Sequence, residues 1–100
     1  MATLTKVLVR AAAGTSTATL YTVPASTTTV VTNIVVNNAA ATAATFTLTL
    51  DGIDIFTTCA IAANTTAMFD MKQVMETTKI IAGFASATTV KFHISGVEIA

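Results

Sequence analysis

Apolar and polar residues alternate along most of this chain with a period of two. The clearest case is one segment in which Phe46, Leu48 and Leu50 are separated by single threonines. Side chains of a β-strand point alternately to opposite faces of a sheet, so this pattern predicts a strand with one face in a core. Near the end of the chain Val90, Phe92 and Ile94 repeat the pattern with equal clarity.

Eight strands follow from this alternation and from the turn residues between them. The predicted strands are 4–11, 17–23, 28–37, 44–50, 53–59, 67–74, 79–85 and 89–95. Asp51-Gly52 between two apolar runs predicts a tight hairpin, because such turns need positive φ. We expect a connector over 60–66, and a helical turn is an alternative for 67–74, which contains good helix formers. Gly96 predicts a bulge before the chain continues to Ile99.

The alternation also assigns side chains to faces. In the first strand, Val7 and Val9 are expected to share one face. In the third strand, Val30 is expected to share a face with Ile34, whereas Val31 lies on the opposite face.

The predicted fold class is all-β, with one domain over residues 1–100. Eight short strands with turn signals about every ten residues indicate an antiparallel β-sandwich of jelly-roll-like type, or a small barrel. A chain of 10.2 kDa should expose roughly 5,300 Å² when folded, which leaves room for one modest core. Residues 1–10 are expected to form an arm that reaches a neighbouring subunit, because their two basic residues are the only charges before Asp51.

Composition changes the picture of the surface. Hydrophobic residues make up 53% of the chain but charged residues only 10%, with a net charge of zero. A soluble domain usually carries about 25% charged residues, so threonine, alanine and apolar side chains must cover much of this exterior. Such a surface is better explained by protein partners than by a free monomer.

The same composition argues against nucleic-acid and membrane partners. The five basic residues are scattered along the sequence and form no patch that would neutralise phosphates. Residues 11–50 carry no charge, but Gly14, Pro24 and several asparagines interrupt them, and their period is that of strands. We therefore expect neither a nucleic-acid partner nor a membrane-spanning helix.

No residue pattern predicts catalysis, a cofactor or a metal site. His93 is the only histidine and lies between Lys91 and Ser95 on a strand face that is expected to point outward. Asp51 and Asp54 share one turn, but Ca²⁺ requires about six to eight oxygen ligands, so a structural role in the turn is favoured. Cys59 is the only cysteine and is expected to act as a small apolar side chain.

Three stretches resemble a recurring element of small virion proteins of tailed bacteriophages. They are Leu20-Tyr21-Thr22-Val23-Pro24-Ala25, then Thr29-Val30-Val31-Thr32-Asn33-Ile34-Val35-Val36-Asn37, and the ending Ile94-Ser95-Gly96-Val97-Glu98. The resemblance implies a non-enzymatic structural subunit located in the virion, at the capsid surface as a decoration or cement protein. A tail, baseplate or fibre-associated subunit is the alternative, and a host-surface or carbohydrate-binding module is a rival of another class.

These expectations converge on self-association and on contacts with the major capsid protein or other virion proteins. A homo-oligomer, with a trimer favoured, would hide roughly 30% of the surface if each of two contacts buried about 800 Å² per partner. Six residues are predicted to lie at the oligomer or capsid interface. They are Leu4, Lys6, Leu8, Arg10, Val31 and Val35.

Overall fold

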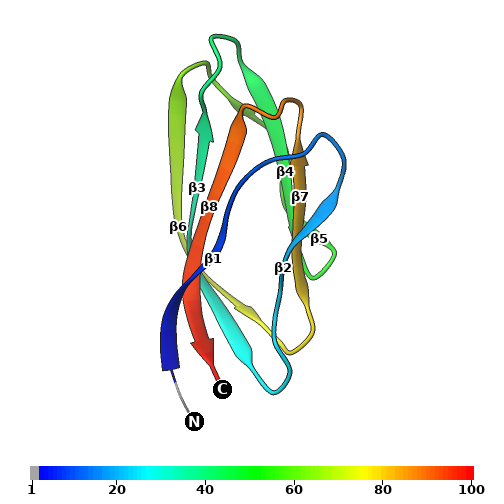
Figure 1. The fold of residues 1–100 in the computed structure, drawn as a ribbon, viewed down its shortest axis with the longest axis vertical. Coiled ribbons are helices and arrows are strands. Elements are labelled where there is room, and N and C mark those ends of the chain that lie inside the picture. Colours follow the sequence, from blue (N-terminus) through cyan, green and yellow to red (C-terminus); the bar gives the residue numbers. More distant parts are fainter. Residues whose placement is uncertain (1–2) are drawn as a thin grey trace.

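The computed structural model describes residues 3–100, and within that range it contains eight strands and no helix (Figure 1). The strands are β1 (Thr3–Ala12), β2 (Ala18–Thr22), β3 (Thr28–Asn38), β4 (Ala44–Leu50), β5 (Ile53–Ile61), β6 (Thr65–Met75), β7 (Ile80–Ala85) and β8 (Val90–Ile99). All eight predicted strands are confirmed. They form because the side chains of threonine, valine and isoleucine fit the pleated surface of a sheet.

The strands form two four-stranded antiparallel sheets. Sheet A has the order β1-β8-β3-β6 and sheet B the order β2-β7-β4-β5. In Figure 1, sheet A lies on the left and sheet B on the right. The antiparallel pairs are β1 with β8, β2 with β7, β3 with β6, and β4 with β5. This is the pairing of one long hairpin wrapped into two layers, which is the jelly-roll arrangement. The two separate sheets decide in favour of the sandwich over a small barrel.

The core lies between the sheets and is connected by aromatic rings. Phe46 of β4 packs against Phe92 of β8, with ring centroids 6.1 Å apart, and thereby joins sheet B to sheet A. Phe46 also contacts Phe56 of β5, which lies 4.6 Å from Phe69 of β6 between ring centroids. The total accessible surface is 5322 Å², which agrees with the size expected from the mass.

Turn residues explain two of the connections. Asp51 and Gly52 have φ values of 56° and 76°, as a two-residue hairpin turn requires, so the predicted hairpin is confirmed. The connector predicted over 60–66 is wrong, because β5 and β6 extend into it and leave a short turn. Asn64 takes a positive φ of 51° in this turn, a conformation that asparagine tolerates well. The helical alternative for 67–74 is also wrong, since β6 covers it.

Bulges flank β8 on both sides. Leu8 is the extra residue of β1 against β8, and Thr32 is the extra residue of β3 against β8. The bulge predicted at Gly96 therefore lies in the neighbouring strands and not in β8 itself. A Cβ atom at Gly96 would lie 2.3 Å from the Val30 carbonyl oxygen, so glycine here permits close approach of two backbones.

These bulges overturn the predicted faces of two strands. Val7 is exposed whereas Val9 is buried, because the extra residue between them reverses the alternation. In β3, Val31 is buried together with Ile34, and Val30 is half-buried on the outer face of sheet A. The expectation that Val30 and Ile34 share a face is wrong for the same reason.

Asn38 fixes the loops at one end of the sandwich. Its side chain is fully buried, and its Nδ2 atom donates to the Thr42 and Ala62 carbonyl oxygens at 2.9 and 3.2 Å. Its Oδ1 atom accepts a hydrogen bond of 3.1 Å from the Ala40 amide. A buried amide is stable only when its polar atoms are satisfied, so Asn38 ties the β3–β4 and β5–β6 connections together.

Candidate functional site

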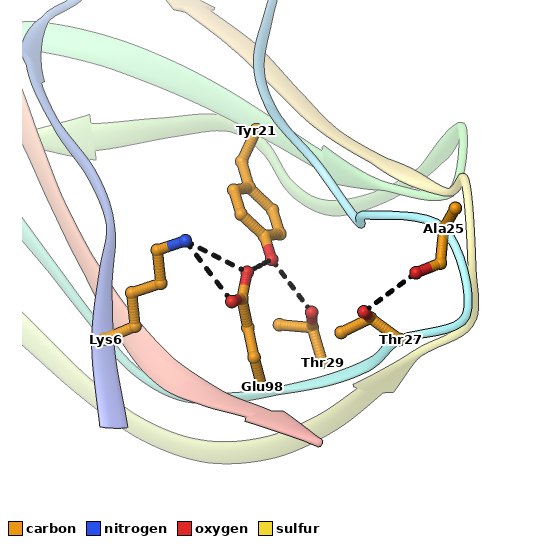
Figure 2. Close-up of polar contacts among 6 residues, drawn as sticks. All are labelled: Lys6, Tyr21, Ala25, Thr27, Thr29 and Glu98. Carbon is orange, nitrogen blue, oxygen red and sulfur yellow. Dashed lines mark hydrogen bonds and ion pairs between the residues drawn. The ribbon is translucent and has the colours of Figure 1, made fainter. Parts of the chain in front are cut away.

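A cluster of polar side chains joins the two sheets near the end of β8 (Figure 2). Glu98 of β8 is only 7% exposed and accepts a hydrogen bond from the Tyr21 hydroxyl of β2. The same hydroxyl lies 2.9 Å from Thr29 Oγ1 on β3, and Lys6 Nζ on β1 lies 3.2 Å from Glu98 Oε1. Side chains of β1 and β2 therefore contact one carboxylate of β8, and Thr29 of β3 joins the cluster through Tyr21.

The inward position of Glu98 follows from the alternation of β8. Phe92, Ile94 and Gly96 all face the core, and Glu98 continues the same parity at the end of the strand. A buried carboxylate requires partners that replace its lost hydration, and Tyr21 and Lys6 supply them. Sequence reasoning missed this cluster, although a glutamate at a core-facing position was a signal that a donor must lie opposite.

The ionisation of the cluster is set by its own contacts. The hydrogen bond from Tyr21 holds the pKa of Glu98 below its usual value, and Lys6 acts in the same direction, against the opposing effect of burial. Burial, reinforced by Glu98, raises the pKa of Tyr21 to about 12. At neutral pH a neutral phenol therefore donates to an ionised carboxylate, and the two sheets are joined by a charge-assisted hydrogen bond.

The two acidic residues of the hairpin turn are engaged separately. Asp51 Oδ1 lies 3.5 Å from Lys79 Nζ, and Asp54 Oδ2 accepts a hydrogen bond of 2.7 Å from the Thr57 hydroxyl. Among residues 3–100, no three His, Cys, Asp or Glu side chains are grouped so that they could hold a metal ion. Within that range the structure brings no third ligand of this kind to Asp51 and Asp54.

His93 and Cys59 lie in different environments. His93 is on the outer face of sheet A, where its cross-strand neighbours are Arg10 of β1 and Val35 of β3. Cys59 is half-buried, lies opposite Phe46 and packs against the core. The structure therefore does not bring the histidine and the cysteine together.

A shallow hollow of about 410 Å³ surrounds His93 on the outer face of sheet A. Arg10, Asn33 and Asn37 contribute polar groups to its lining. The Asn33 Oδ1 atom is buried and has no hydrogen-bond partner in the described part of the chain. Asn37 Nδ2, by contrast, donates to Thr66 Oγ1 at 2.9 Å. The hollow thus combines a cation with the amide side chains of two asparagines.

The predicted interface residues of β1 are divided between surface and core. Leu4 is 58% exposed and Arg10 is exposed, whereas Leu8 is buried in the core. Lys6 is also exposed, but its Nζ atom lies 3.2 Å from Glu98 Oε1 of the same chain. Residues 3–10 pair with β8 of the same chain, and Met1 and Ala2 of the predicted arm lie outside the described residues. Contact of this segment with a neighbour stays a prediction.

The two predicted interface residues of β3 are also separated. Val31 is fully buried and belongs to the core of the single chain. Val35 is half-buried on the outer face of sheet A, next to His93. Of the six predicted residues, only those outside the core offer surface to a partner in this conformation.

Exposed apolar side chains are concentrated on the edge strands. Leu4 and Val7 lie on β1, Ile53 lies on β5, and Met68 and Val74 lie on β6. Strands β1 and β6 are the two edges of sheet A, and β5 is an edge of sheet B. An exposed edge with apolar side chains is a natural place for another strand to pair.

The described part of the chain contains no helix of sufficient length and apolarity to cross a membrane. Comparison with known proteins found no matching family model and no match among curated proteins.

Proposed function

We propose that this protein is a non-enzymatic structural subunit of a tailed-bacteriophage virion, and specifically a capsid decoration or cement protein. It acts as a homo-oligomer, with three copies as the favoured number, and it binds the major capsid protein or other virion proteins at the capsid surface. Its mechanism is passive. Burial of apolar surface and pairing of strand edges hold neighbouring capsid subunits together.

One observation carries this proposal. The three stretches that resemble phage virion proteins are separated in the sequence but meet in space. Tyr21 belongs to the first stretch, Thr29 begins the second and Glu98 ends the third, and these three side chains share one hydrogen-bonded cluster. Gly96 of the third stretch lies against the Val30 carbonyl of the second. The three stretches therefore form one packed structural unit, as a shared structural element would require.

Architecture and surface give weaker support. Jelly-roll sandwiches are common in viral capsid domains, although this argument is an analogy at the level of the fold. The exposed apolar side chains of β1, β5 and β6, together with the low charge of the chain, suit a subunit that is covered by partners.

Quantitative mass spectrometry of purified particles tests the proposal. We expect the protein in intact virions at a fixed ratio to the major capsid protein, and we expect tail-less heads to retain it. Its absence from purified particles would contradict a virion role. A few copies per particle that are lost with the tail would favour the alternative, a tail, baseplate or fibre-associated subunit.

A host-surface or carbohydrate-binding role is a second candidate, favoured by the hollow around His93. Arg10 offers donors there, and Asn33 and Asn37 add amide groups to the lining, so a ligand with hydroxyl groups would complement the hollow. A glycan array with the purified protein distinguishes the roles. Binding that is abolished by Asn33→Leu would support this candidate, and an array without signal would contradict it.

A further inference from the structure

We propose that copies of this chain associate head to tail, with β1 of one copy added to the free edge of β6 of the next. The occupant of each edge is thus a second copy of the same chain, and sheet A continues from one subunit into its neighbour. This proposal deepens the self-association in the proposed function by naming the strands that meet.

The directions of the strands permit this contact. Neighbouring strands of sheet A are antiparallel throughout, so β1 and β6 at its two edges run in opposite directions. A copy placed beside β6 without being turned over therefore presents β1 antiparallel to β6. Both edges are long, with 10 residues in β1 and 11 in β6, and both carry exposed apolar side chains.

The distribution of charge favours contact between unlike edges over contact between like edges. Strands β1 and β8 carry three cationic side chains and one carboxylate, a net charge of +2. Residues 51–79, which include β5 and β6, carry four carboxylates and two lysines, a net charge of −2. Strands β2, β3, β4 and β7 carry no charged side chain. A two-fold contact would join edges of the same sign, whereas a head-to-tail contact joins opposite signs.

Individual side chains complement one another in the same arrangement. Arg10 lies on the outer face of sheet A, because its cross-strand neighbour is His93. Asp70 lies on the same face, because its neighbour is Asn33, which alternates with the buried Ile34. A register that places Arg10 of one copy opposite Asp70 of the next forms an ion pair across the contact. The same register places the exposed Ala12 opposite Met68, which is 76% exposed.

A contact between unlike surfaces generates a closed ring or an open filament, depending on the rotation between copies. A ring of three would use β1 and β6 of every copy and leave no free edge in sheet A. Such a ring would remove the tendency to aggregate that the unpaired edges of sheet A give the isolated chain. The head-to-tail contact therefore agrees with the trimer of the proposed function, whereas a pairing of β6 with β6 would close after two copies.

Charge reversal tests the contact in solution. We expect Arg10→Asp and Asp70→Arg each to weaken self-association of the purified protein at least about tenfold, because like charges then face each other. The double variant restores the ion pair and should return the dissociation constant to within about threefold of the original. If Arg10→Asp has no effect, or if the double variant is as weak as the single ones, the proposal is overturned.

Disulfide trapping tests the register independently, in a Cys59→Ser background that removes the native thiol. Copies with Ala12→Cys and copies with Met68→Cys should form a mixed disulfide dimer when combined under oxidising conditions. The matched control combines Met68→Cys with Thr19→Cys, an exposed position on β2, and should stay uncross-linked. Equal cross-linking in the control, disulfides formed by Met68→Cys alone, or no mixed dimer would each overturn the head-to-tail contact.

These experiments use the purified chain alone and contain no virion component. A failed cross-link would therefore overturn the head-to-tail contact and leave the virion assignment standing. Absence of the protein from purified particles would overturn the virion assignment without changing the result in solution. Each variant should unfold on heating with the same midpoint temperature as the parent protein. A loss of association then reflects the changed contact and not a damaged fold.

Discussion

Strands β8 and β6 belong to the same sheet and have similar lengths and similar alternation, but their inward faces differ. In β8, Val90, Phe92 and Ile94 are fully buried. In β6, Phe69 is only half-buried, and Met75 is the one buried side chain. The difference comes from position: β8 has strands on both sides, whereas β6 is hydrogen-bonded only to β3. Burial therefore depends on neighbours that the strand's own sequence does not reveal.

This comparison separates two tasks within one sheet. The interior of the sandwich, represented by β8, holds the fold together through complete burial of apolar side chains. The free edge, represented by β6, contributes less to the fold and leaves side chains such as Met68 and Val74 exposed. Mutations on the two strands should accordingly affect different measurements.

The largest contrast is expected between two phenylalanines. Phe92→Ala removes a fully buried ring from β8 and should lower the free energy of unfolding by about 3–5 kcal/mol. Phe69→Ala on β6 should cost about 1–2 kcal/mol, since its ring is half-buried and loses less contact on truncation. Chemical denaturation at equilibrium measures both. Equal costs would contradict the division between interior and edge.

The cluster at the end of β8 should show the next largest effect. Tyr21→Phe removes the hydroxyl that donates to Glu98 and should cost about 1.5–3 kcal/mol, the usual contribution of a hydrogen bond to a charged group. The single variant Glu98→Gln and the double variant with Tyr21→Phe complete a double-mutant cycle. The cycle measures the coupling energy between the side chains of Tyr21 and Glu98. Simple additivity of the two single costs would show that they do not stabilise each other.

The same cluster predicts the response to pH. The pKa of Tyr21 is raised above its unfolded value of 10.0 to about 12, so its contribution to stability is complete below pH 10 and is lost between about pH 10 and 12. The pKa of Glu98 is lowered from 4.5, so its contribution is present above pH 4.5 and is lost as the pH falls below that value. Tyr21 is the only tyrosine and the chain has no tryptophan, so tyrosinate absorbance measures the first effect directly. If Tyr21 in the folded protein lost its proton near pH 10, this would contradict its hydrogen bond to Glu98.

The smallest effect on the fold is expected at the surface of β6. Met68→Thr replaces an exposed side chain with a residue that favours strands, and unfolding should change by less than about 0.5 kcal/mol. Self-association should nevertheless weaken, because Met68 lies at the proposed contact. Denaturation in dilute solution and sedimentation at higher concentration measure the two effects separately. A large loss of stability in dilute solution would show that Met68 supports the fold.

Much of the fold could be predicted because local patterns determined it. Alternation over Phe46, Leu48 and Leu50 was sufficient to place β4, and Asp51-Gly52 was sufficient to place the following hairpin. Threonine on the alternate positions distinguished strands from helices. These signals act over a few residues and do not depend on the rest of the molecule.

The bulges could not be predicted, because they arise between strands. Leu8 and Thr32 are ordinary residues for a strand, and each becomes an extra residue only against β8. Each bulge reversed the faces of the residues beyond it, so Val31 and not Val30 entered the core. The close approach at Gly96 was the relevant signal, but it marked the bulged neighbours and not the glycine's own strand.

The candidate site was predictable only in part. The low charge of the sequence predicts a partner-covered surface, and this stays a prediction. The structure shows that exposed apolar residues lie on the edge strands. The separation of charge, with β1 and β8 positive and residues 51–79 negative, could be recognised only from the order of the strands. Lys91 is remote from Arg10 in the sequence, but the two residues lie on neighbouring strands of sheet A. Likewise, the partner of Glu98 could be identified only once β2 was seen to cross to its end of the sandwich.

The central claim is that this sparsely charged surface makes contact with further copies of the chain. Sedimentation equilibrium of the purified chain tests this claim most directly. The account predicts a mass of about three times the 10.2 kDa of the chain, with reversible dissociation on dilution. A single species of 10.2 kDa that persists at high protein concentration would contradict it.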